Sequence, residues 1–238
     1  MKKQKVVRDY GIIHGGIRSI TITSNDKYHF TSGFEDNGHV KQFSVRNGKM
    51  IKNYGAFFED GVDPITTTPD NNYLFASSDQ GHLKQISLES QQVVHDYGKI
   101  HDLSIRCLET TRDSKWLITG SFDKHVKRIS VENRQLDKDL GQVCDHRITR
   151  MKITADGEKF FVGDERGHLK LISLRDGEVI KHFGQVHDYD ITGILITEDK
   201  KSFFTSSTNG GLKQWNYQDN TLVKDHGKII YCIRSLCL

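Results

Sequence analysis

Apolar residues in this chain fall in short runs of about five to eight positions, separated by polar turn residues. In one such run Ile148, Met151 and Ile153 are apolar, and polar residues stand between them. The runs are rich in Val, Ile, Phe, Thr and Tyr, which favours strands over helices. Turn residues such as Asp156-Gly157 tolerate the backbone angles of a tight turn. The pattern predicts an all-β chain.

The apolar runs repeat with a near-constant period. The glycine that ends the segment VVRDYG recurs at intervals of 44, 43, 43, 43 and 43 residues. These glycines are Gly11, Gly55, Gly98, Gly141, Gly184 and Gly227. Each unit repeats three further segments, which in the third unit read IRCLETT, WLITG and KHVKRISV. Four short antiparallel strands in about 43 residues are typical of one blade of a β-propeller.

We therefore predict a β-propeller of four-stranded antiparallel blades, forming a single domain over residues 1–238. The repeats are expected at 6–49, 50–92, 93–135, 136–178 and 179–221, with a partial repeat at 222–238. The second strand carries apolar neighbours such as Leu74-Phe75 and Phe160-Phe161, which point to opposite faces of a sheet. Each sheet should therefore be buried between two neighbouring blades.

Several residues of the unit resemble the WD-repeat family, also called Gβ- or transducin-like repeats. The third unit carries His101, Ser121 and Asp123 at the family's positions, and the fifth carries Trp215 followed by Asn216. Elsewhere the tryptophan position holds Phe43, Ile86, Ile129 and Ile172. The resemblance implies that the family's Trp–Ser–His–Asp hydrogen-bond network is complete in no unit. We expect the blades to be held mainly by apolar packing.

The family's strand order makes VVRDYG the outermost strand of a preceding blade and IRSLCL the innermost strand of a following one. It implies five complete blades, from about Ile17 to Gly227, with one orphan strand at each end. Because propellers of this family usually close with about seven blades, we expect the chain to be a fragment of a larger ring. The alternative is that the two orphan strands meet in a minimal sixth blade.

Charge and hydropathy narrow the classes of partner. The net charge of +3 comes from 34 basic and 31 acidic residues mixed along the chain, whereas nucleic-acid-binding domains usually show a clustered basic excess. No apolar run has the length of a membrane span or of a signal peptide. We expect no nucleic-acid or membrane partner and a location in the cytoplasm or nucleus. The four cysteines, Cys107, Cys144, Cys232 and Cys237, form no CxxC motif and are expected to be reduced.

Two sets of polar residues recur with the repeat. The histidines are His39, His82, His125 and His168, and equivalent positions on successive blades should not converge on one metal ion. The lysines are Lys41, Lys84, Lys127, Lys170 and Lys213. Their stems should cover the neighbouring blade while the ammonium groups reach water. The alternative is a basic annulus that attracts phosphate or an acidic partner.

The chain carries no GxSxG elbow, phosphate-binding glycine loop or HExxH motif. We therefore predict a protein that is not an enzyme, with no catalytic residue, no cofactor and no metal. A propeller enzyme of the lactonase or quinoprotein type would need carboxylates or histidines lining the channel. The inner strands offer Asp63, Glu109, Lys152 and a few arginines. A nucleic-acid-binding propeller is the other alternative.

The expected function is that of a scaffold for protein–protein interaction within a larger chain or complex. The resemblance implies that a partner binds the face formed by the loops entering the first strand and the loops between the second and third strands. The predicted contact residues are His14, Asp60, Asp79, His101, Asp102, Phe122, Asp145, Glu165, His187, Asp188 and Thr208. Because Asp60, Asp102, Asp145 and Asp188 make this rim acidic, a basic peptide or protein surface is the expected partner.

Overall fold

A computed structural model describes residues 8–33, 38–59 and 61–229 of the chain. These residues form twenty strands in five separate four-stranded sheets, and each sheet follows chain order. The part of the chain so described contains no helix, and hence none long and apolar enough to cross a membrane. The prediction of an all-β chain built from antiparallel four-stranded blades is confirmed.

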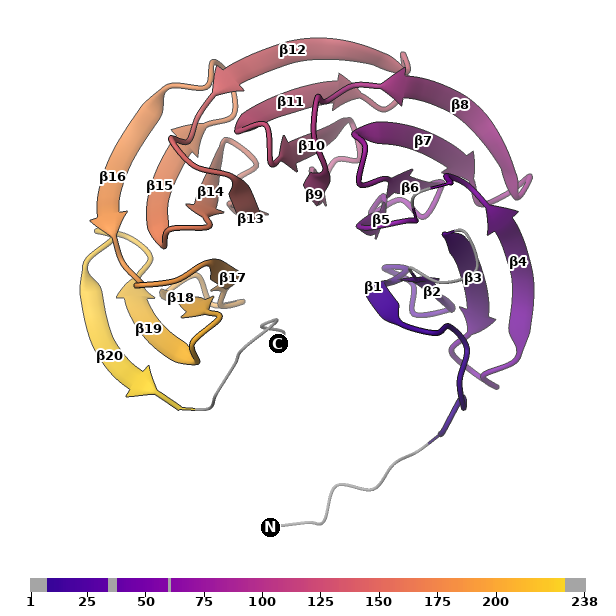
Figure 1. The fold of residues 1–238 in the computed structure, drawn as a ribbon, viewed down its shortest axis with the longest axis horizontal. Helices are drawn as coiled ribbons and strands as arrows, with labels where there is room; N and C mark the ends of the chain where they lie inside the picture. The colour runs from indigo at the N-terminus through magenta and orange to yellow at the C-terminus, as the bar shows by residue number, and fades with distance from the viewer. Residues whose placement is uncertain (1–7, 34–37, 60, 230–238) are drawn as a thin grey trace.

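Each blade is a meander in which the first strand lies nearest the centre of the arc and the fourth strand lies on the outside (Figure 1). Blade 1 comprises β1 (Ile17–Ile22), β2 (Tyr28–Gly33), β3 (His39–Ser44) and β4 (Met50–Ala56). Blade 2 comprises β5 (Ile65–Thr67), β6 (Tyr73–Ser77), β7 (His82–Ser87) and β8 (Gln92–Lys99). Blade 3 comprises β9 (Ile105–Thr110), β10 (Trp116–Ser121), β11 (His125–Ser130) and β12 (Gln135–Gln142). Blade 4 comprises β13 (Ile148–Ile153), β14 (Lys159–Asp164), β15 (His168–Ser173) and β16 (Val179–Gln185). Blade 5 comprises β17 (Ile191–Ile196), β18 (Ser202–Ser207), β19 (Gly211–Asn216) and β20 (Leu222–Lys228).

Four hydrophobic clusters fill the four junctions between the five blades. In the second strands, Leu74 packs in the cluster shared with blade 1 and Phe75 in the cluster shared with blade 3. Phe160 packs towards blade 3 and Phe161 towards blade 5 in the same way. All four side chains are almost fully buried. The expected burial of both faces of each sheet is therefore confirmed at these strands.

Glycine in the second strand lets neighbouring blades approach closely. A Cβ atom added at Gly120 would lie 2.7 Å from Sδ of Met151, and one added at Gly163 would lie 2.7 Å from Cγ2 of Ile191. A methyl group at position 163 would push blades 4 and 5 apart, because Cβ of Ile191 also lies 2.7 Å away and cannot turn aside. At position 120 the flexible end of the Met151 side chain can move to make room.

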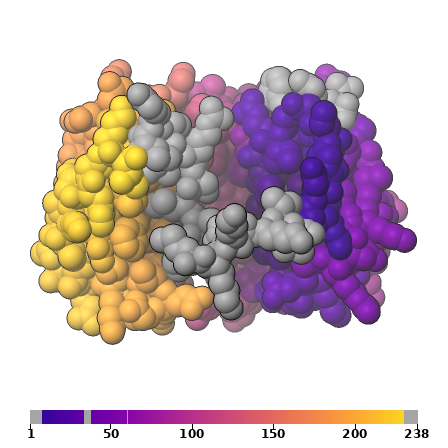
Figure 2. Space-filling view, turned by 90° about the horizontal axis from the view of Figure 1, so that it is seen from below, coloured from indigo at the N-terminus to yellow at the C-terminus, as the bar shows by residue number. Residues whose placement is uncertain are grey.

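The described blades form an arc that is open between blade 5 and blade 1 (Figure 1). Figure 2 shows these two blades on either side of the opening. On blade 1, Ile17 and Ile20 are 50% and 63% exposed, whereas their counterparts Ile148 and Met151 on blade 4 are 0% and 5% exposed. Blade 1 begins the arc, and no described strand covers the side of it that carries these isoleucines. On blade 4 the equivalent side is covered by blade 3.

The two predicted orphan strands fall mostly outside the described residues. At the N-terminus, residues 6 and 7 lie outside them, and residues 8–11 are described but are not in a strand. The segment IRSLCL lies entirely outside them.

Candidate functional site

The rim of loops on one face of the arc is the candidate site. In a meander the connections alternate between the two ends of the strands. The loops that join blades and the turns between second and third strands therefore share one face. In blade 3 this face carries the loop at residues 100–104 and the turn at residues 122–124. Turns such as residues 111–115 belong to the opposite face.

A loop of this rim is fastened to the blade that it leaves. The carbonyl of Gly81, in blade 2, accepts hydrogen bonds from the amides of Ile100 and His101 at 2.9 and 3.2 Å. Gly167 binds the amides of Val186 and His187 in the same way at 2.8 and 3.2 Å. A Cβ atom at Gly81 would lie 2.0 Å from the carbonyl oxygen of His101, so this contact needs glycine.

The same loop is fastened to the blade that it enters. His101 is 2% exposed, and its Nδ1 lies 2.8 Å from Oδ2 of Asp123 while its Nε2 lies 2.8 Å from Oγ1 of Thr119. Burial alone would raise the pKa of Asp123. The hydrogen bond and charge of His101, with the backbone amides of His125 and Asp102, outweigh burial and lower this pKa to about 2. An ionised Asp123 thus holds the loop against blade 3.

The hydrogen-bond network differs from the one the resemblance implied, because the hydroxyl group that meets His101 belongs to Thr119. Ser121 instead donates to the carbonyl of Leu103 at 3.1 Å. Thr119 lies in the middle of β10, where its side chain points towards the loop, whereas Ser121 lies at the strand end. Blade 3 therefore has the Thr–His–Asp part of a network, and Ile129 stands where the tryptophan would complete it.

Blade 5 has the complementary part. Nε1 of Trp215 donates to Oγ1 of Thr205 at 3.0 Å, and Thr205 also lies 2.9 Å from Nε2 of His187. Asn209 stands where blade 3 has Asp123. Burial, with the positive charge of Lys213 nearby, lowers the pKa of His187 to about 4. Polar networks therefore reinforce the apolar packing that was expected to hold the blades.

The repeated lysines bind the rim loops through their ammonium groups. Nζ of Lys84 donates to the carbonyl of Phe57 at 2.9 Å, Nζ of Lys127 to that of Ile100 at 2.6 Å, and Nζ of Lys170 to that of Val143 at 3.1 Å. Lys41 makes the equivalent contact with Ile13, and Lys213 pairs with Asp225 at 3.1 Å. These ammonium groups hold the chain in place. The expectation that they simply reach water is therefore wrong for these lysines, and the basic annulus stays an untested alternative.

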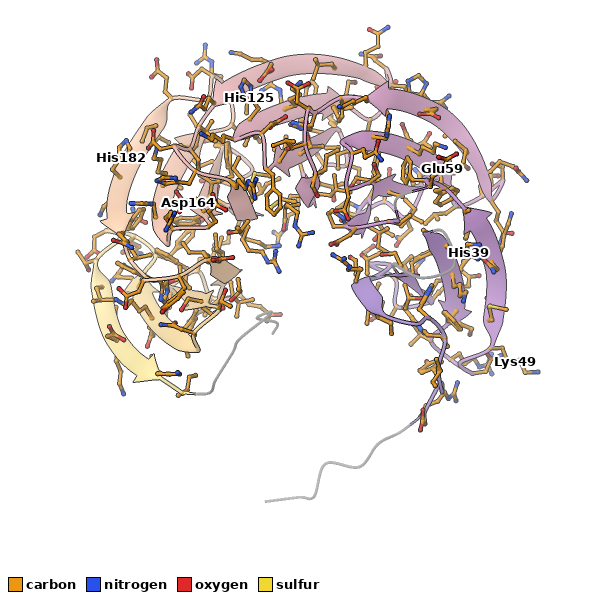
Figure 3. All side chains as sticks on the ribbon, in the orientation of Figure 1. His39, Lys49, Glu59, His125, Asp164 and His182 are labelled. Atoms are coloured by element: carbon orange, nitrogen blue, oxygen red, sulfur yellow. The ribbon has the colours of Figure 1, made fainter. Side chains whose placement is uncertain are left out.

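The repeated glycine of each unit lies at a β-bulge in the pairing of the third and fourth strands. In three blades an aspartate two positions before this glycine forms an ion pair with the repeated lysine. Asp96, Asp139 and Asp225 each accept a hydrogen bond from the amide of the following glycine, Gly98, Gly141 or Gly227. Each also pairs with the lysine of its blade, at 3.1–3.6 Å. In blade 4 the position is His182 of β16, which is labelled in Figure 3, and Lys170 pairs instead with Asp145 from the rim loop at 3.2 Å.

The recurring histidines lie on separate blades. Figure 3 shows His39 on blade 1 and His125 on blade 3, well apart around the arc. His125 lies 3.2 Å from Asp139, and Nδ1 of His168 lies 3.2 Å from Asp164. Across residues 8–33, 38–59 and 61–229, no three His, Cys, Asp or Glu side chains are grouped to hold a metal ion. Cys107 and Cys144 are buried free thiols, and burial raises the pKa of each to about 12. Cys232 and Cys237 lie outside the described residues.

The predicted rim residues divide into buried and accessible groups. His14, His101 and His187 are 2–6% exposed, and their rings bind Thr31, Thr119 and Thr205 within the blades. These rings shape the rim from inside, because Nε2 of each lies 2.8–2.9 Å from the hydroxyl oxygen of a buried threonine. Asp102, Asp145, Asp188 and Thr208 are exposed, Asp79, Phe122 and Glu165 are partly exposed, and Asp60 lies outside the described residues. Contact with a partner stays a prediction for the accessible group.

The sequence analysis noted a few arginines on the inner strands but did not predict that the structure would bring them together around Asp63. Arg106 lies 2.8 Å from Asp63, and Arg18 lies 3.5 Å from the same carboxylate. Burial raises the pKa of Asp63 although both arginines act to lower it. The other carboxylate of the inner strands, Glu109, lies 3.1 Å from Lys152. Both carboxylates that the enzyme alternative would use are therefore bound to cations.

Comparison with protein families supports the resemblance found in the repeat. The family model described as "WD domain, G-beta repeat" matches residues 92–128, which run from β8 to the middle of β11. The matched segment contains His101, Thr119 and Asp123. No curated protein matches the chain. The resemblance to the WD-repeat family is thus confirmed over residues 92–128, within a chain built of propeller-type blades.

Proposed function

We propose that this protein is a non-catalytic scaffold that binds a protein partner through the rim formed by its interblade loops and the turns between second and third strands. WD40 repeats in general serve as platforms for protein interaction, which supports the broad assignment. The observation that carries the proposal is the fastening of the rim loops to both adjacent blades. A surface that is already ordered loses little conformational entropy when a partner binds.

Charge on the rim favours a basic partner. Asp102, Asp145 and Asp188 are exposed, and they occupy corresponding positions in the loops that enter blades 3, 4 and 5. The Asp145 side chain is 79% exposed, and its hydrogen bond with Lys170 lowers its pKa. A row of carboxylates attracts lysine and arginine side chains and disfavours acidic surfaces.

The test uses a fluorescein-labelled twelve-residue peptide in which arginine alternates with glycine. Fluorescence anisotropy at about 0.05 M and 0.15 M salt should detect binding that weakens at the higher concentration. The variant Asp102→Lys/Asp145→Lys/Asp188→Lys should bind the peptide at least about tenfold more weakly.

The matched control reverses three exposed carboxylates on the opposite face, with Glu132→Lys, Glu158→Lys and Glu198→Lys. It changes the net charge by the same amount. Equal loss in both variants would mean that only overall charge matters, and the rim would not be the binding surface.

A further inference from the structure

A depression of about 780 Å³ is lined by residues from the inner strands of several blades. These strands surround the centre of the arc (Figure 1). Its wall includes Arg18 of β1, Arg106 of β9 and Arg150 of β13, together with Thr208 from the rim of blade 5. Residues far apart in the chain therefore share one concave surface that opens beside the proposed partner-binding rim.

Positive charge predominates in this depression. Asp63 is the carboxylate that faces its arginines among the described residues of the wall, and Glu109 is bound to Lys152. Arg106 and Arg18 both approach Asp63. Arg150 donates from Nε to the carbonyl of Thr192 at 2.8 Å and from Nη1 to that of Thr149 at 2.7 Å. Two of the guanidinium groups thus approach Asp63, and Arg106 also lies 3.9 Å from Asp79. Backbone carbonyls fix the orientation of Arg150.

The Phe122 ring lies next to one arginine of the depression and one arginine of the rim. The guanidinium carbon of Arg106 lies 5.3 Å from the ring centre of Phe122, and that of Arg147 lies at the same distance. Arg147 belongs to the loop that enters blade 4 and is exposed. Stacking on an aromatic ring limits the motion of a guanidinium without using its hydrogen-bond donors.

We infer that these arginines bind one anionic side chain, a phosphate or a carboxylate, of a peptide that lies across the rim. The inference rests on the proposed function and specifies the chemistry of the partner. Guanidinium groups bind both anions through paired, charge-assisted hydrogen bonds. Because Asp102, Asp145 and Asp188 are exposed on the loops that enter blades 3, 4 and 5, the residues that flank the anion should be basic.

The arrangement of charges disfavours a nucleic acid as the ligand. A nucleic-acid strand presents phosphates in series, and those beyond the mouth would lie against the exposed rim aspartates. A single anion between basic residues satisfies both the arginines and the aspartates.

The test compares three twelve-residue peptides with the same basic ends and phosphoserine, glutamate or serine at the centre. Anisotropy measurements should give a dissociation constant at least about tenfold lower for the phosphoserine or the glutamate peptide than for the serine peptide. The better of the two identifies the anion as phosphate or carboxylate.

Variants then locate the site. Arg147→Ala removes an exposed side chain, and Arg150→Met removes one that lines the depression. Each should reduce the preference for the anionic peptide by about tenfold and leave the serine peptide unaffected. Arg112→Ala is the matched control, because Arg112 is an exposed arginine on the opposite face. Thermal melting checks the fold of each variant, and Arg147→Ala alone suffices if Arg150→Met unfolds.

The outcomes separate the two proposals. Equal binding of all three peptides, lost in the rim-aspartate variant, would overturn the anion site and support the proposed function. No binding of any peptide would contradict both. Tighter binding of a single-stranded oligonucleotide than of the phosphopeptide, lost in Arg147→Ala, would overturn the inference in favour of a nucleic-acid ligand.

Discussion

Nζ of Lys127 donates a hydrogen bond of 2.6 Å to the carbonyl oxygen of Ile100, which lies 27 residues earlier in the chain. The lysine is in the third strand of blade 3, and Ile100 begins the loop that brings the chain into that blade. The ammonium group also lies 3.6 Å from Asp139. One side chain therefore ties a rim loop to the outer part of its blade.

Replacing Lys127 by methionine should keep the aliphatic stem and remove this tie. A charge-assisted hydrogen bond contributes about 1.5–3 kcal/mol, so we expect the free energy of unfolding to fall by about 2 kcal/mol. Urea denaturation measures the change, and hydrogen exchange should show faster opening at residues 100–104. Lys115→Met is the control, because Lys115 is 72% exposed and its ion pair with Asp113 is 3.9 Å long. An equal loss in both variants would argue against the tie.

Replacing His182 by aspartate should restore in blade 4 the arrangement seen in other blades. His182 stands opposite Lys170, as Asp139 stands opposite Lys127. An aspartate there could accept a hydrogen bond from the amide of Gly184, and we expect a gain of about 0.5–1 kcal/mol in thermal or urea unfolding. His182→Asn supplies the same acceptor without the charge, as Asn53 does for Gly55 in blade 1. If both variants are less stable than the native protein, the β-bulge at Gly184 does not need a side-chain acceptor at position 182.

Replacing Asp123 by asparagine should destabilise the protein in a pH-dependent way. The pKa of Asp123 is lowered from 3.8 to about 2, so its ionised form stabilises the fold fully above pH 4 or so. This contribution is about 2 kcal/mol and is lost as the pH falls towards 2. Urea denaturation at pH 7, 5 and 3 should show the gap between native and variant protein narrowing below about pH 4. The exposed neighbour Asp102→Asn controls for the loss of one charge, and a gap independent of pH would contradict the role given to His101.

Replacing His187 by glutamine should make the free energy of unfolding depend less on pH between about 6.5 and 4. Burial lowers the pKa of His187 from 6.5 to about 4, so the unfolded chain takes up a proton before the folded protein does. The native protein should lose stability as the pH falls from about 6.5 to about 4, by up to about 3 kcal/mol. Urea denaturation at pH 8, where protonation of the histidine no longer contributes, measures the loss of stability that comes from altered packing alone. An unchanged slope between pH 6.5 and 4 in the variant would show that another group is responsible.

The period of the sequence determined the blades of this protein. A repeat of about 43 residues with four β-rich segments leaves each sheet with two apolar faces, and only stacking of neighbouring sheets buries both. Leu74 and Phe75 illustrate this point, because their adjacency in sequence required the two separate clusters that the structure contains. The turn at Asp156-Gly157 followed from local backbone preferences in the same way.

Tertiary structure alone decided which polar groups meet. Thr119 rather than Ser121 reaches His101, since the choice depends on how the loop descends onto the blade. Arg106 is the second residue of its inner strand and Arg150 the third, so comparison of repeats does not align them, yet both line one depression. The repeat of the sequence determines the strands of each blade and their packing against the two neighbouring blades. The meeting of single side chains from different units around an axis depends on the rotation between blades, which no segment of sequence encodes by itself.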